Sequence, residues 1–236
     1  PAAGGDGVTT ETTFTTDKRP LSELLSQIES GQIQLPDFQR GWIWDDDHIR
    51  DLIESVSLGY PIGTIMLLET GGQGVRFRPR PLDGVENPTE EPKYLILDGQ
   101  QRLTSLYRAL RSRRVVLTCD ARKNPVSRWY YIDMNDALRA NGDRSEAIVS
   151  LPEDRKQLSF KREVIHDLST QDLEFAKCMF PLNQVFDPAE WRWGYNHHWG
   201  HDPERGKAFD RFEQRIVKKI QAYQVPVIIV MRETPK

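Results

Sequence analysis

The chain has 236 residues, and its 32 Lys and Arg against 35 Asp and Glu give a formal net charge of −3. This composition excludes a disordered or fibrous protein, and the length suits one large domain or two small ones. No apolar run approaches the roughly 20 residues that a membrane-spanning helix needs, and 2 Cys residues cannot form a disulfide framework. We therefore expect a cytoplasmic protein without a membrane partner. The near-neutral total argues against general affinity for nucleic acid, but not against a local basic patch.

The two ends of the chain lead to different expectations. Residues 1–18 are rich in Gly and Thr and show no periodicity, which predicts a flexible lead-in before one domain at 19–236. The apolar run Val225–Met231 predicts a strand, and a short, mostly polar stretch follows it. Because a protein rarely ends directly after a core strand, we expect a fragment of a longer protein.

The domain begins with a helix and an extended segment. Apolar residues at helical spacing start at Leu21, with Pro20 suited to the helix start and Gly31 to its end. Residues 33–44 follow, and Pro36 makes this segment extended or irregular.

An acidic triplet opens the second helix. Asp45–Asp47 precede apolar residues at helical spacing, and Gly59 marks the end of the pattern. Consecutive carboxylates diverge around a helix start, where the helix dipole favours them. We interpret the triplet as helix capping and predict no metal site.

The remaining elements follow without a regular strand–helix–strand rhythm, which favours an α+β fold. Apolar runs predict strands, and helical spacing predicts two later helices. The strands are expected at 62–68, 94–97, 115–119, 129–132 and 225–231, and the helices at 172–178 and 209–223.

Aromatic and His side chains gather near the C-terminal end, within residues 134–206, a region that carries no motif known to us. The members are Trp191, Trp193, Tyr195, His197, His198, Trp199 and His201. An aromatic insertion at the surface fits this cluster best, and a ligand or DNA contact through stacking is the second interpretation. A metal site is the weakest, because Gly200 disfavours a helix that holds two His one turn apart.

The strongest local signal is a strand, a turn and a helix over residues 94–111. The helix begins just after Gly99, and a helix N-terminus presents unpaired N–H groups and the positive end of the dipole. Gly99 has no Cβ to hold an anion away from the backbone. Arg102 adds a guanidinium suited to phosphate, and Gln100 and Gln101 add donors and acceptors. This pattern predicts a phosphate-binding site, although no Gly-Lys-Ser/Thr of a Walker A loop follows.

The same part of the chain is locally basic. Between Gly99 and Tyr130 there are eight Lys and Arg and one acid, a balance of +7 in a chain of net charge −3. One interpretation is a solvated helix face with Asp98 as the helix cap, and the other is a surface that binds phosphate. The local pattern alone supports both equally.

A second signal is Phe38-Gln39-Arg40-Gly41-Trp42. A Gln-Arg pair beside Trp residues suits a phosphate and a flat base together. Taken alone, a structural Arg that stacks on a core Trp is the better interpretation.

Together, Leu35-Pro36-Asp37-Phe38-Gln39-Arg40-Gly41-Trp42-Ile43-Trp44 and Ile96-Leu97-Asp98-Gly99-Gln100-Gln101-Arg102-Leu103-Thr104-Ser105-Leu106 resemble the GmrSD N-terminal-domain family, of the ParB/sulfiredoxin-like superfamily. The resemblance covers residues 20–110, and the strand at 225–231 is similar to another family element. It implies a small mixed sheet with flanking helices, here with a helical, aromatic-rich C-terminal portion. Residues 134–206 would be an insertion or subdomain.

The resemblance implies a domain that binds and hydrolyses a nucleoside triphosphate with Mg²⁺, within an anti-phage restriction system. Such a domain senses modified DNA and controls a nuclease elsewhere in the polypeptide or in a partner subunit. The base of the nucleotide is left open, and so is hydrolysis by this chain. The expected catalytic residues are Asp98, Gln100, Gln101 and Arg102, the nucleotide-binding residues Gln39, Arg40, Gly99, Arg102 and Thr104, and the DNA contacts Phe38, Trp42, Arg108 and Arg111.

Two alternatives compete with this hypothesis. In the first, the chain is a non-catalytic DNA-binding module that grips phosphate through residues 99–130. In the second, it is a protein-interaction domain that regulates a nuclease. The sequence shows no nuclease motif, since Asn196-His197-His198 are contiguous and cannot form a metal-and-base site of the His-Asn-His kind. We therefore expect cleavage of DNA outside this chain, and we expect residues 37–40 and 98–102 to meet in one cleft.

Overall fold

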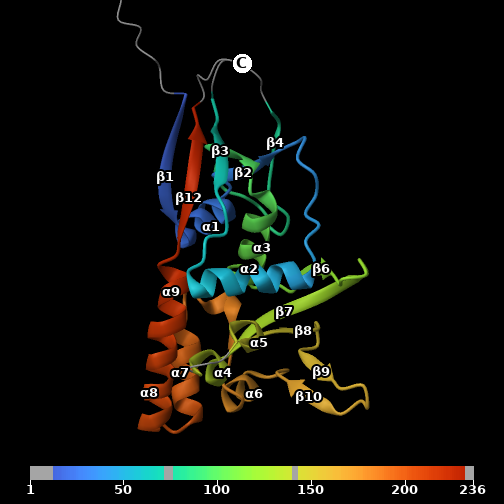
Figure 1. Cartoon of the computed structure of the whole chain (residues 1–236), viewed down its shortest axis with the longest axis vertical. Helices are drawn as coiled ribbons and strands as arrows, with labels where there is room; N and C mark the ends of the chain where they lie inside the picture. The colour runs from blue at the N-terminus through green and yellow to red at the C-terminus, as the bar shows by residue number, and fades with distance from the viewer. Residues whose placement is uncertain (1–12, 72–76, 140–142, 232–236) are drawn as a thin grey trace, which may run out of the picture.

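The computed structural model describes residues 13–71, 77–139 and 143–231. Its architecture is α+β, as the sequence predicts. Figure 1 shows a mixed sheet in the upper half of the molecule and a smaller sheet around strand β7 (Pro125–Asp133) below it. Helix α2 (Asp46–Leu58) crosses between the two sheets. Helices α7 (Ala189–His198), α8 (Pro203–Phe212) and α9 (Lys218–Gln221) gather on one side of the lower half.

The larger sheet has the strand order β1-β12-β3-β5-β2-β4. Its strands pair antiparallel, parallel, antiparallel, parallel and antiparallel in that order. The strand bounds are β1 Phe14–Pro20, β12 Gln224–Val230, β3 Ile65–Glu69, β5 Tyr94–Asp98, β2 Ile33–Pro36 and β4 Pro79–Arg80. The mixed sheet that the resemblance implies is therefore present.

The expected flexible lead-in is wrong for residues 14–18. They form the first part of β1, which pairs with β12 from Phe14↔Val230 to Pro20↔Gln224. Most of β1 is exposed, so its sequence lacks the alternation of apolar and polar residues that predicts a strand. Its hydrogen-bond partner is β12, which lies near the other end of the chain. Residues 1–12 lie outside the described residues.

The lower part of the molecule holds two smaller sheets. In one, β7 pairs with β6, β8 and β11, and in the other β9 pairs with β10. The bounds are β6 Val116–Cys119, β7 Pro125–Asp133, β8 Ile148–Leu151, β9 Lys156–Leu158, β10 Val164–Asp167 and β11 Met179–Pro181.

Helices α1 and α2 end at the glycines that the sequence predicts, and α2 begins at the predicted acidic triplet. Asp45 caps α2 by accepting a hydrogen bond from the His48 N–H, and Gly31 and Gly59 end α1 and α2 with positive φ. The predicted helix at 209–223 is divided by a π-helical turn at 213–217. The helical bounds are α1 Leu21–Ser30, α2 Asp46–Leu58, α3 Gln100–Leu110, α4 Met134–Leu138, α5 Arg144–Ala147, α6 Gln171–Ala176, η1 Leu182–Gln184, α7 Ala189–His198, α8 Pro203–Phe212, η2 Glu213–Val217 and α9 Lys218–Gln221.

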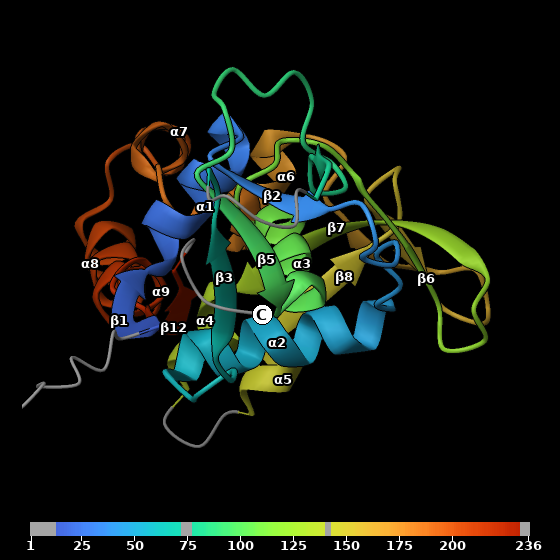
Figure 2. The same ribbon diagram turned by 90° about the horizontal axis from the view of Figure 1, so that it is seen from above.

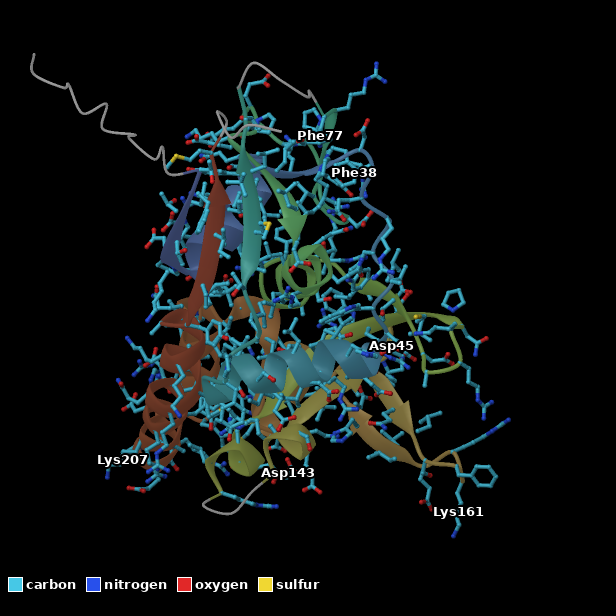
Figure 3. The ribbon with its side chains drawn as sticks, turned by 45° about the horizontal axis from the view of Figure 1, so that its top comes forward. Phe38, Asp45, Phe77, Asp143, Lys161 and Lys207 are labelled. Carbon is cyan, nitrogen blue, oxygen red and sulfur yellow. The ribbon has the colours of Figure 1, made fainter. Side chains whose placement is uncertain are left out.

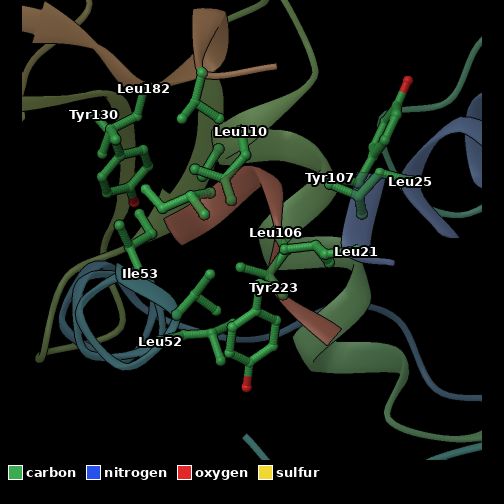
Figure 4. Close-up of a cluster of buried hydrophobic side chains, with 14 of the residues drawn as sticks. Leu21, Leu25, Leu52, Ile53, Leu106, Tyr107, Leu110, Tyr130, Leu182 and Tyr223 are labelled. Atoms are coloured by element: carbon green, nitrogen blue, oxygen red, sulfur yellow. The ribbon is translucent and has the colours of Figure 1, made fainter. Parts of the chain in front are cut away.

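Helix α3 lies at the centre of the main hydrophobic core. Leu106 and Leu110 pack among apolar side chains from α1, α2, β7 and the segment before β12, as Figure 4 shows. This core also takes in buried residues of 134–206, such as Phe180 and Trp191. The region without a known motif is thus packed into the same core as the helix that carries the Asp-Gly-Gln-Gln-Arg motif.

The aromatic cluster is only partly at the surface. Trp191 and Tyr195 are fully buried on α7, and their rings stack at a centroid distance of 5.3 Å. Trp193 is 67% exposed and stacks on His197. The expectation of a surface insertion is therefore wrong for the inner face of α7, because these rings fill space between α6 and α8.

Candidate functional site

The two sequence motifs meet at the start of α3, and Figure 2 shows strand β5 ending beside this helix. The Gln39 side-chain amide donates to the carbonyl oxygen of Leu97 at 2.9 Å, and the Gln100 amide donates to the carbonyl oxygen of Arg40 at 2.7 Å. The two partners of the first bond are 58 positions apart in the chain, and those of the second are 60 positions apart. The predicted contact between the two motifs is confirmed, whereas the cleft stays a prediction.

Gln101 completes the connection between α3 and the opposite segment. Its amide group donates to the Gly41 carbonyl oxygen at 3.2 Å, and its side-chain oxygen accepts from the Ile43 N–H at 2.9 Å. The side-chain amides of Gln39, Gln100 and Gln101 therefore bind backbone groups of the protein, whereas the sequence predicts that they bind a ligand. Gln100 is only 4% exposed, so its first role is to position residues 40–43.

Gly99 is required by its neighbours as well as by its backbone. Its φ is +91°, a region that residues with a Cβ rarely adopt. A Cβ at this position would lie 2.2 Å from Cδ1 of Ile65 on β3. The sequence predicts that Gly99 lets an anion approach the backbone closely. In the structure, the side chain that needs this space is Ile65, so packing of β3 against the turn explains the glycine.

Arg102 lies between two acceptors. It donates to the carbonyl oxygen of Ile62 at 2.8 Å and to the Asp98 carboxylate at 2.9 Å. Its side chain is 19% exposed, whereas that of Asp98 is 69% exposed. A Cβ on Gly63 would lie 2.4 Å from the guanidinium, so Gly63 leaves the space that Arg102 occupies.

The outer rim of the site is open. Phe38 is 57% exposed and contacts Phe77 edge to face, as Figure 3 shows. Arg40 is exposed, and a Cβ added at Gly41 would meet nothing within 4 Å. Arg40 is thus placed beside the start of α3 with its side chain accessible to a ligand.

Three of the expected contact residues lie deeper than the sequence suggests. Thr104 is fully buried, so its hydroxyl has no access to a ligand at the surface. The Trp42 indole N–H donates to the Ser105 hydroxyl at 2.9 Å, and the Arg108 guanidinium lies 4.5 Å from the Trp42 ring centroid. Burial lowers the pKa of Arg108, and the negative charge of Asp83 acts in the opposite direction. An Arg does stack on this Trp, but it is Arg108 rather than Arg40.

Sequence reasoning missed two residues that support this segment. The Arg80 guanidinium donates to the Gln39 carbonyl oxygen at 3.0 Å, and the Asp83 carboxylate accepts from the Trp42 N–H at 3.1 Å. Both come from residues 79–92, a Pro-rich and acidic stretch that carries no local sign of this contact.

Comparison with known families matches residues 21–235 to the N-terminal domain of the GmrSD restriction endonuclease. The chain belongs to this family. The matched range includes residues 134–206, where the motifs alone showed no likeness.

An uncharacterized protein of Methanocaldococcus jannaschii is also similar to this GmrSD N-terminal domain. The two are 32% identical over 174 residues, which is 70% of this chain and 28% of that protein. The chain thus spans little more than a quarter of the length of its relative.

The basic segment of this GmrSD N-terminal domain is largely neutralised by its fold. Five of its eight cations form ion pairs with acids: Arg102 with Asp98, Arg111 with Glu29, Arg114 with Glu86, Lys123 with Asp45, and Arg128 with Asp46. Burial disfavours the Asp45 carboxylate, but hydrogen bonds from His48 and Lys123 outweigh it and hold its pKa well below the usual range. The pairing weakens the interpretation of residues 99–130 as a DNA-binding surface.

Two further features bear on other kinds of site. A cavity of about 190 Å³ lies beyond the other end of α3, between Arg113, Trp129 and Glu174, and is separate from the two motifs. Within the described ranges, no group of three His, Cys, Asp or Glu is placed to hold a metal, and no helix is long and apolar enough to cross a membrane.

Replacing Gln100 by Glu is expected to destabilise the fold by about 2 kcal/mol at neutral pH, because a buried carboxylate would face the Arg40 carbonyl oxygen. The protonated acid can donate to that carbonyl, so its pKa in the folded state lies above the unfolded value. The variant should therefore approach wild-type stability below pH 4 and lose it as the pH rises. Urea unfolding at several pH values measures this, and a deficit that does not change with pH contradicts it.

Proposed function

We propose that this domain binds a nucleoside triphosphate at the start of α3, as part of a restriction enzyme that acts on modified DNA. The observation that carries the proposal is the contact between residues 39–43 and 97–101. Family membership supports the restriction system, and the resemblance of the two motifs supports the nucleotide. The nuclease would lie outside this chain or in a partner subunit.

The start of α3 suits the phosphates of a nucleotide. The first turn of α3 contains no acidic residue, and Gly99 provides no side-chain cap, so its first N–H groups stay available to an anion. Arg40 is exposed beside them, and Arg102 can exchange its bond to Asp98 for a phosphate oxygen. The two guanidinium groups and the helix N-terminus would supply the positive charge that phosphates need.

Asp98 is the residue that fits Mg²⁺. Its carboxylate is 69% exposed and offers the oxygen ligand that this ion prefers, together with nucleotide phosphates and water. A bound Mg²⁺ would screen the phosphate charge. Ligation by Asp98 would also release Arg102 toward the phosphates.

For hydrolysis, Gln101 is better placed than Gln100 to orient water. Gln101 is partly exposed, and its bond to the Gly41 carbonyl oxygen is 3.2 Å long, whereas the buried Gln100 holds the Arg40 carbonyl at 2.7 Å. Exchange of the longer, exposed bond costs less free energy. We assign Gln101 the positioning of water and Gln100 the positioning of Arg40.

Calorimetric titration of the chain with ATP and with GTP, each with and without Mg²⁺, tests the proposal. We expect saturable binding that Mg²⁺ strengthens, with plasmid DNA left intact in the same mixture. Absence of binding for both nucleotides would refute the proposal. Nicking of the plasmid that survives Arg102→Ala would show a nuclease centre within this chain.

A further inference from the structure

A two-stranded hairpin, residues 156–167, projects from the lower part of the molecule and is called the β9–β10 arm here. Figures 1 and 3 show it standing away from the body, on the side opposite α8 and α9, with Lys161 at its tip. Strands β9 and β10 pair only with each other among the described residues. An isolated hairpin is marginally stable in water, so an arm of this kind gains from a partner.

The tip of the arm combines one aromatic ring with two cations and one acid, Glu163, which is also exposed. Phe160 is 106% exposed, which means that no part of the protein covers it. Lys161 and Arg162 follow directly and are exposed. Leu158 and Val164, a cross-strand pair at the base of the tip, are 54% and 58% exposed.

The turn itself carries an unusual residue. The Ser159 N–H donates to the Glu163 carbonyl oxygen at 2.7 Å, and the Arg162 N–H donates to the Ser159 carbonyl oxygen at 2.9 Å. Arg162 has φ of +62° at a place in such hairpins where Gly is the usual residue. The left-handed conformation costs some stability, and the turn holds the Arg162 side chain at the exposed tip.

We infer that the β9–β10 arm contacts double-stranded DNA, with Phe160 against the bases in a groove and Lys161 and Arg162 on the flanking phosphates. Cations position a protein on the DNA backbone, and exposed apolar side chains act as wedges between base steps. Interface cores between proteins are enriched in Phe and Arg, so Phe160 and Arg162 would also suit a protein partner, but two adjacent cations at the tip favour the phosphate backbone of DNA. The inference rests on the proposed function only in taking DNA as the partner.

Fluorescence anisotropy of a labelled 20-base-pair duplex, titrated with the chain at several salt concentrations and without nucleotide, tests the arm. Lys161→Ala combined with Arg162→Gly should weaken binding at least tenfold and lower the slope of log K against log salt by about 1.8, since each phosphate contact contributes about 0.9. Arg162→Gly also relieves the left-handed backbone, so this variant should fold normally. Phe160→Ala should weaken binding about tenfold with the slope unchanged, because it removes no charge.

The matched control is Lys218→Ala combined with Lys219→Ala, which removes two exposed cations from α9 on the other side of the molecule. It should bind DNA as the wild type does. Wild-type affinity in both arm variants, or no DNA binding by the unaltered chain, would overturn the inference. Nucleotide titration is a separate measurement, so failure of the arm and failure of the nucleotide site can be told apart.

Discussion

Arg102→Ala is expected to weaken nucleotide binding by about tenfold to a hundredfold, because charge-assisted hydrogen bonds contribute about 1.5–3 kcal/mol each. The same change removes the bond to the Ile62 carbonyl oxygen, so the melting temperature should fall by about 2–4 °C. Titration calorimetry and a thermal melt measure the two effects. Affinity that is unchanged in a folded variant would remove Arg102 from the site.

Arg139→Ala is the matched control for this experiment. Arg139 is also an arginine in an ion pair, with Asp136 three positions earlier at 3.0 Å, but it is 70% exposed and lies far along the chain, directly after α4. Its loss should leave both nucleotide affinity and melting temperature near wild type, since exposed pairs contribute little. A decrease in nucleotide affinity here would indicate a general charge effect instead of a contact by Arg102.

Gly99→Ala is expected to destabilise the fold by about 3 kcal/mol or more. The new Cβ would combine a left-handed φ, which costs about 1–3 kcal/mol, with a clash against Ile65 that costs a similar amount. Urea unfolding measures the loss. The start of α3 would shift as well, so nucleotide affinity should fall with it.

Two other glycines separate the causes. Gly59 also has a positive φ, +80° against +91° at Gly99, but a Cβ there would meet nothing within 4 Å, so Gly59→Ala is expected to cost about 1 kcal/mol from the backbone alone. Gly41→Ala has neither problem and should change stability by less than about 0.5 kcal/mol. Adding Ile65→Val to Gly99→Ala removes the clashing methyl, so the double variant should lose less than the sum of the single changes. Strict additivity would contradict the clash.

Local signals in the sequence were sufficient for much of the fold. Helices α1, α2 and α3 were predicted because apolar residues at helical spacing and Gly at the ends act within one or two turns of chain. Strand β1 was not predicted, because its stability comes from hydrogen bonds to β12 and its own side chains are exposed. The sequence likewise predicts the inner face of α7 as surface, since nothing local shows that α8 covers it.

Motifs and periodicity are local properties, so the family, the α+β class and the two segments of the candidate site follow from the order of residues alone. What those segments do to each other depends on the folded chain. The structure shows that Gln39, Gln100 and Gln101 hold opposite backbone groups. It also shows that acids distant in sequence neutralise most of the local +7. Ion pairs and side-chain hydrogen bonds depend on distances in space, and these distances cannot be read from the order of residues along the chain.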